Sequence, residues 1–312
     1  MIESPASKET KKISSKGKSG TFFYFRLIFK DKSGFIGLII VSLFFGWSLI
    51  EGVLQFYASV TNHPGIGIIL LPHNPFKLNL LASEMPPSYF YLLGTDANGE
   101  DILSRILYAL PRDALISLIV VISAIAIGSV LGIVSGYMGK MTDEVIMRVT
   151  DAFLAVPALI LVIAISVVLG GSYAGAVIGL LVVWWPVYAR LFRAQTLKIK
   201  NLDFMQATKL NNVSIFKLFF RYLFLNDTDP IIAYAALDFG QVILTYSVLA
   251  FLGIGLTPPI PELGSMSANG VAALPTAWWW AIFPGFAILI LVIGFVLLGD
   301  RLQDIISNRI NY

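Results

Sequence analysis

Few side chains in this 312-residue sequence could carry out acid, base or metal chemistry. The chain has no cysteine, which excludes thiol catalysis, thiolate metal sites and disulfides. The only histidines, His63 and His73, lie in a segment rich in proline and glycine, and a metal site needs more ligands in a defined geometry. We therefore predict no catalytic residue and no metal site in this chain.

One short stretch, Gly17-Lys18-Ser19, has the last three letters of a phosphate-binding loop. Lys12 replaces the first glycine of that motif and no strand precedes it, so we attribute the match to chance. The sequence also contains no Gly-x-Ser-x-Gly elbow, no HExxH run and no evident pair of catalytic carboxylates. We expect the chain to bind no cofactor and to hydrolyse no nucleotide itself.

The composition indicates a polytopic, all-α membrane protein, because 57% of the residues are hydrophobic and only 13% are charged. Most apolar blocks reach the roughly 18–20 residues that cross a bilayer. The first block is too long for a signal peptide and no clear cleavage site follows it, so we expect it to remain as an anchor. The sequence predicts six transmembrane helices, at about 35–57, 114–137, 152–170, 174–193, 230–252 and 278–299.

The basic residues indicate how these helices are oriented. If the N-terminus lies inside, the only Lys and Arg residues outside are Lys77, Arg105 and Arg112. Short cytoplasmic segments carry the excess of positive charge, so we predict a plasma-membrane protein with both termini in the cytoplasm. The predicted organisation is a basic cytoplasmic tail at 1–33, an anchor helix at 34–57, an extracellular segment at 58–113, a core of five transmembrane helices at 114–305 and a cytoplasmic C-terminus at 306–312.

Ionisable residues inside a membrane are costly and often mark a function. Asp238 lies about eight residues into the fifth predicted span, near Gln241 and Tyr234. It could line a pathway or bond to a neighbouring helix, or it could lie hydrated at the depth of the cytoplasmic interface, and the sequence leaves these alternatives open. Near the third span, Asp143, Arg148 and Asp151 predict ion pairs within the chain.

Four segments between about 90 and 305 carry specific patterns. They are GTDANGEDILSRILY (94–108), GYMGKMTDEVIMRVTDAFLAVPALIL (136–161), VLAFLGIGLTPPIPELGSM (248–266) and AWWWAIFPGFAILILVIGFVLLGDRLQD (277–304). In order and spacing they resemble the signatures of permeases of the dipeptide/oligopeptide/nickel family of ABC transporters. The anchor and the long outer segment are similar to those of the second, C-type permease. The departures are Glu100 where Arg is usual, Ala250 for Ser, Leu263 for Trp and Val296 for Asn.

Residues 204–226, FMQATKLNNVSIFKLFFRYLFLN, occupy the place of that family's EAA loop. The resemblance implies a cytoplasmic coupling helix that fits a groove on an ATPase subunit. Gln206 replaces a glutamate and loses its charge, Asn212 replaces a glycine, and Leu225 removes the fixed kink of a proline. The residues expected to form the ATPase contact are Gln206, Ala207, Thr208, Lys209, Asn212, Ser214 and Arg221.

The resemblance also implies a type I ABC importer fold and a shared mechanism. The chain would pair with a second homologous permease, with two ATPase subunits that bind ATP and Mg, and with an extracellular solute-binding protein; no nucleic acid is expected. Di- or oligopeptides are the leading cargo, oligosaccharides or nickel chelates are alternatives, and a proton-coupled carrier ranks lower. The predicted pathway or gate residues are Asp238, Gln241, Phe251, Gly253 and Gly255, although 251–261 could equally be an ordinary span terminus.

Overall fold

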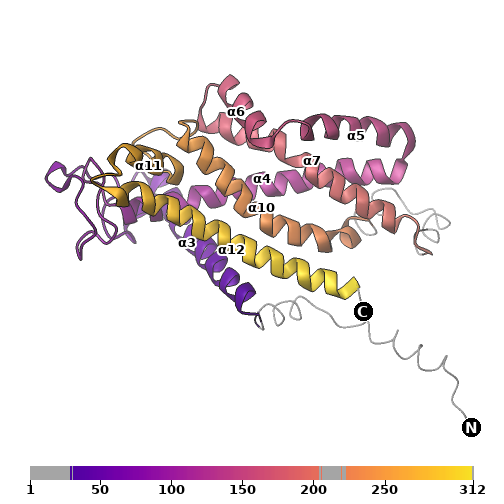
Figure 1. The fold of residues 1–312 in the computed structure, drawn as a ribbon, viewed down its shortest axis with the longest axis horizontal. Helices are drawn as coiled ribbons and strands as arrows, with labels where there is room; N and C mark the ends of the chain where they lie inside the picture. Colours follow the sequence, from indigo (N-terminus) through magenta and orange to yellow (C-terminus); the bar gives the residue numbers. More distant parts are fainter. Residues whose placement is uncertain (1–28, 30, 204, 206–218, 220–222, 311–312) are drawn as a thin grey trace, which may run out of the picture.

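Long helices dominate the computed structural model, which describes residues 29, 31–203, 205, 219 and 223–310. In this part of the chain the only β-type pairing is two isolated bridges, Thr95–Asp101 and Ser172–Gly255. The long helices lie side by side, and the two long connections, at 62–101 and 252–277, gather at one end of them (Figure 1). The elements are α3 (Lys32–Thr61), η1 (Ile66–Ile68), η2 (Leu80–Ala82), α4 (Ile102–Met138), α5 (Lys140–Leu154), α6 (Ala158–Val168), α7 (Tyr173–Ile199), α10 (Leu225–Phe251), α11 (Leu263–Gly270), η4 (Val271–Ala273) and α12 (Trp278–Ile310).

Five of these helices are long and apolar enough to cross a membrane, which agrees with five of the six predicted spans. They cover Lys32–Thr61, Ile102–Met138, Tyr173–Ile199, Pro230–Phe251 and Trp278–Ile306. Several extend beyond the predicted boundaries: α4 begins at Ile102 rather than 114, and α12 continues past 305 to Ile310. Asp101 explains the early start of α4, since its carboxylate accepts a hydrogen bond from the Ser104 amide at 2.9 Å and caps the helix.

The predicted third span, 152–170, is not one continuous helix. The chain bends by 86° between α5 and α6, and only the two helices together meet the length and hydropathy expected of a span. Helix α6 has 11 residues and rises only about 16 Å, roughly half of a bilayer core. Pro157 explains the break, because it lacks an amide hydrogen and disfavours helical geometry in the residue before it.

Helices α4 and α7 approach each other closely along three glycines of α4, spaced four residues apart. A Cβ atom on Gly128 would lie 2.4 Å from the Tyr188 Cβ, and one on Gly132 would lie 2.4 Å from the carbonyl oxygen of Ala189. A Cβ on Gly136 would be 2.9 Å from the Thr196 Cβ. Small residues at this spacing let two helix backbones touch, which is the usual packing mode within membranes.

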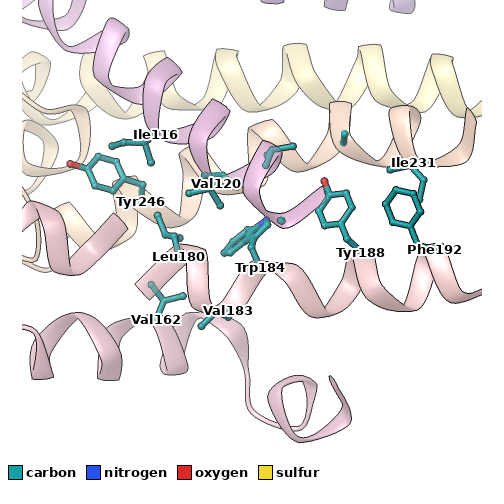
Figure 2. Close-up of a cluster of buried hydrophobic side chains, with 14 of the residues drawn as sticks. Ile116, Val120, Val162, Leu180, Val183, Trp184, Tyr188, Phe192, Ile231 and Tyr246 are labelled. Atoms are coloured by element: carbon teal, nitrogen blue, oxygen red, sulfur yellow. The ribbon is translucent and has the colours of Figure 1, made fainter. Parts of the chain in front are cut away.

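Two hydrophobic clusters fill the bundle. One joins α4, α6, α7 and α10 around Leu180, Tyr188 and Tyr246 (Figure 2). The other joins α3, α4, α10, α11 and α12 around Phe44 and Phe295, whose rings meet edge to face with centroids 5.9 Å apart. On the outside of α3 and α12 many large apolar side chains are exposed, as expected for surfaces that face lipid.

Candidate functional site

Asp238 of α10 is held by two side chains of α7. The indole N–H of Trp184 and the hydroxyl of Tyr188 donate hydrogen bonds to its Oδ2, at 2.8 and 2.9 Å. Asp238 is only 6% exposed. It is therefore a buried partner of a neighbouring helix, one of the alternatives that the sequence left open, and its place on a pathway stays a prediction.

A cavity of about 320 Å³ lies beside this carboxylate, at the break between α5 and α6. Its walls combine apolar residues around Pro157 with polar groups of α10, namely Tyr234, Asp238, Gln241 and Thr245. Such a mixture of apolar walls with a few convergent polar groups is typical of small-molecule sites. The bend that the sequence did not predict thus forms one wall of the site.

Sequence reasoning missed Trp184, Tyr188 and Thr245. A signal was present in their spacing, since Trp184 and Tyr188 are four residues apart on one helix face, and Asp238, Gln241 and Thr245 follow at intervals of three and four. Nothing in the sequence states that these two faces oppose each other. Predicted pathway residues Asp238 and Gln241 therefore come together in the structure with partners that were not predicted.

The other predicted gate residues lie elsewhere, at the end of α10. The helix ends at Phe251, which is 45% exposed, and the chain then turns through Gly253 at φ 81° and Gly255 at φ 138°. Both glycines adopt backbone angles that other residues rarely tolerate. None of these three residues lines the Asp238 cavity, and the Gly255 amide instead donates to the Gly171 carbonyl at 3.0 Å. Their role as a gate stays a prediction.

The predicted ATPase-coupling residues, Gln206, Ala207, Thr208, Lys209, Asn212, Ser214 and Arg221, lie outside the described residues. The helix that leads into this segment is anchored by an ion pair and a hydrogen bond. Arg193 of α7 binds the Asp143 carboxylate at 2.5 and 2.6 Å, and Lys200 Nζ donates to the Tyr137 carbonyl at 2.5 Å.

The ion pairs within the chain that were predicted near the third span are present, and the structure identifies their partners. Arg148 binds Glu144 at 2.6 Å within α5, and Asp151 binds Arg190 of α7 at 2.6 Å. Both pairs are exposed, so each contributes little to stability. Only the Asp151–Arg190 pair joins α5 to α7, because the Arg148–Glu144 pair lies within α5.

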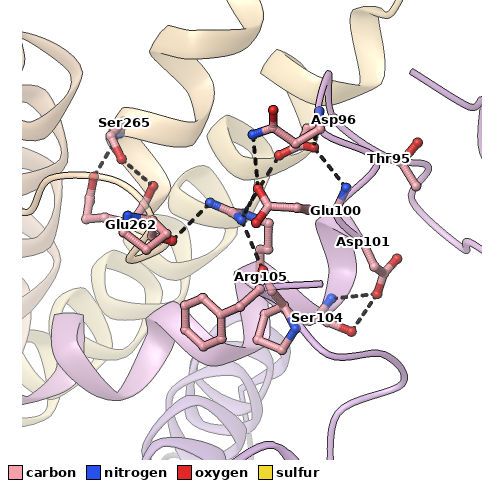
Figure 3. A network of polar contacts seen from close by, with 12 residues as sticks. Thr95, Asp96, Glu100, Asp101, Ser104, Arg105, Glu262 and Ser265 are labelled. Atoms are coloured by element: carbon pink, nitrogen blue, oxygen red, sulfur yellow. Dashed lines mark hydrogen bonds and ion pairs between the residues drawn. The ribbon is translucent and has the colours of Figure 1, made fainter. Parts of the chain in front are cut away.

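Residues 62–101 and 252–277 together form what we call the cap, and a buried ion-pair network joins them to α4 (Figure 3). Arg105 of α4 pairs with Glu100, donates to the Pro75 carbonyl at 3.0 Å and reaches the Pro259 carbonyl at 3.5 Å. Asp96 accepts the amide hydrogens of Asn98 and Glu100, each at 2.9 Å. Glu100, the departure noted in the sequence, is thus the direct partner of Arg105. Burial raises the pKa of Glu100, and the Arg105 charge opposes that rise.

Comparison with known proteins agrees with this architecture. Residues 128–312 match a family described as the binding-protein-dependent transport system inner membrane component. A dipeptide transport system permease protein of Haemophilus influenzae is 34% identical over 295 residues, which cover 93% of this chain and 94% of that protein. A probable D,D-dipeptide transport system permease protein of Escherichia coli K12 is 38% identical over 240 residues, covering 77% of this chain and 80% of that protein.

A third relative extends the same pattern. A di/tripeptide transport system permease protein of Pseudomonas aeruginosa is 36% identical over 245 residues, which cover 77% of this chain and 80% of the relative. The family match covers more than half of the chain, and the similarity to permeases extends over nearly all of it. The chain, a multi-pass helical membrane protein, therefore belongs to the family of inner membrane components of binding-protein-dependent transport systems.

Proposed function

We propose that this permease moves di- or oligopeptides across the plasma membrane as a subunit of an ATP-driven importer. The observation that supports peptides as the transported solute is the similarity to a dipeptide transport permease over 93% of the chain. The Asp238 cavity supports it, because a buried carboxylate at the wall of a roughly 320 Å³ space suits a solute with a cationic amino group.

In this proposal, other subunits complete the transporter. A second homologous permease completes the path, an extracellular solute-binding protein delivers the solute, and two ATPase subunits bind ATP and Mg and hydrolyse the nucleotide. Both termini and the coupling segment 204–226 face the cytoplasm, which is supported by the distribution of Lys and Arg. Closure of the ATPases then pushes the coupling helices and rocks the permease halves into alternating access.

Reconstitution tests this proposal. The complete transporter is placed in vesicles with its binding protein, and uptake of labelled dipeptides, an oligosaccharide and a nickel chelate is compared with and without ATP. We expect ATP-dependent uptake of dipeptides that is abolished by catalytically inactive ATPase subunits. Preferred uptake of the sugar or the chelate would contradict the peptide assignment. Uptake that follows a proton gradient without ATP would instead support a carrier.

A further inference from the structure

Three fully buried side chains near the cap carry oxygens that no other described residue satisfies. They are both carboxylate oxygens of Asp113, Oε1 of Glu262 and the hydroxyl of Tyr246. Asp113 and Glu262 are each 1% exposed and Tyr246 is 0% exposed. An unpaired buried polar group is destabilising, so four such oxygens in one region require an explanation.

The three residues come from three elements that meet at one place. The first turn of α11, which Glu262 caps, lies on α10, since a Cβ on Gly264 would be 2.0 Å from the Ser247 carbonyl oxygen. Tyr246 is the residue before Ser247, and Figure 2 shows its ring beside Ile116 of α4. Ile116 lies one helical turn from Asp113 on the same face. Asp113 and Glu262 interact electrostatically, and both interact with Tyr246.

Few other charges reach this site. Arg112 of α4 is a cation that interacts electrostatically with Asp113 and Tyr246, and its guanidinium lies 4.9 Å from the Tyr108 ring centre and 3.5 Å from the Tyr108 carbonyl oxygen. Tyr173 of α7 is a further titratable neighbour. Helix α11 and residues 278–299 of α12 contain no ionisable side chain. Arg105 forms its ion pair with Glu100 and donates to the Pro75 carbonyl.

Two carboxylates in such an apolar region cannot both be ionised without a large desolvation and repulsion cost. A proton on either one removes that charge and provides an O–H donor for an unpaired oxygen nearby. We propose that Asp113 and Glu262 form a proton-binding site which, when protonated, ties α4 and α10 to the cap, with Tyr246 as the third polar member. The site lies apart from the Asp238 cavity and depends on no assumption about the cargo.

The pH at which this site operates follows from Glu262, which lies outside the spans. Burial raises its pKa from the ordinary 4.5 to about 7, and hydrogen bonds from Ser265 and Gly264 only partly oppose this. Because the folded protein holds the proton more tightly than the unfolded chain, the stabilisation is complete below pH 4.5 and is lost as the pH rises through about 7. The link between α11 and the bundle should therefore loosen above neutral pH.

Infrared spectroscopy of the purified transporter tests the proposal directly. We expect a protonated-carboxyl C=O band that titrates around pH 7 in the wild type. That titration should disappear in Glu262→Gln, whereas Asp113→Asn should reduce the number of titrating carboxyl groups at the site from two to one. Glu144→Gln, an exposed carboxylate on α5, is the matched control and should leave the titration unchanged. A titration that is unchanged in both site variants would overturn the proposal.

A measurement on the wild type covers the case in which the variants do not fold. Amide hydrogen exchange of α11 in the intact transporter should become faster as the pH passes 7, after correction for the intrinsic pH dependence of exchange. The exposed helix α5 should show no such additional change. Equal corrected rates for α11 on both sides of pH 7 would contradict the proposal, as would protection at high pH that Na⁺ restores, because that result would indicate a small-cation site.

Discussion

Trp184 of α7 donates its indole N–H to the Asp238 carboxylate of α10 across 2.8 Å. The two residues are 54 positions apart in the sequence, and the bond is buried. Tyr188, one turn further along α7, donates to the same oxygen. This arrangement holds the carboxylate at the wall of the cavity and links α7 to α10 through two hydrogen bonds.

Replacement of Asp238 by Ala should destabilise the protein by roughly 2–5 kcal/mol, because the Trp184 and Tyr188 donors then lose their acceptor inside the bundle. Asp238→Asn retains a carbonyl acceptor and should cost less than half as much. Unfolding of the purified protein in detergent, followed by tryptophan fluorescence, measures both. Gln241→Ala alters an exposed residue of the same cavity and should leave the stability unchanged; equal losses in all three variants would refute this account.

Replacement of Gly132 by Ala should destabilise the contact between α4 and α7. The added Cβ would lie 2.4 Å from the Ala189 carbonyl oxygen, so the helix backbones must separate. Overpacking of this kind costs about 1–3 kcal/mol. Gly46→Ala is the matched control, since a Cβ there meets no atom within 4 Å and Ala is the better helix former. Thermal unfolding should separate the two variants, and an equally stable Gly132→Ala would contradict the close approach.

Loss of Arg105 should loosen the cap. Arg105→Gln leaves Glu100 buried without its cation, which costs about 3–5 kcal/mol, whereas adding Glu100→Gln should restore part of that stability. The pKa of Glu100 should rise further in the single variant, so its stability should decline more steeply with increasing pH than that of the wild type.

Limited proteolysis of residues 62–101 at several pH values measures this effect. Arg148→Gln breaks an exposed pair with Glu144 and should change the cleavage rate little, since such pairs contribute about 0.3–0.5 kcal/mol. Cleavage of the Arg105 variant at the wild-type rate would show that the network does not hold the cap.

Bulky charged replacements of Gln206 and Thr208 should uncouple ATP hydrolysis from transport in reconstituted vesicles. The reason is steric and electrostatic, because these residues occupy the position of a helix expected to fit a groove on the ATPase. The ratio of solute imported to ATP hydrolysed should fall, while the assembly of the permease in the membrane should not change. Asn201→Lys, on the exposed approach to this segment, is the control. Unchanged coupled transport would remove 204–226 from the mechanism.

Hydropathy was sufficient to predict the membrane class and most of the helices, because a run of about 20 apolar residues has few alternatives to a spanning helix. The sequence also contained local signals for helix boundaries. Asp101 caps the start of α4, and the chain turns at Gly253 and Gly255 after the end of α10. Its motifs placed the chain in a transporter family before any contact was known. These features depend on neighbouring residues, which is why one sequence suffices to find them.

Which groups meet could be read only from the packed helices. The bond from Trp184 to Asp238, the contact of Arg105 with the Pro259 carbonyl, and the electrostatic interaction of Asp113 with Glu262 depend on how distant segments pack. The size of the bend at Pro157 belongs here too, because a proline marks where a helix breaks and not the direction that the chain then takes. Packing energies that span 50 or more residues select these contacts, and a single sequence does not display them.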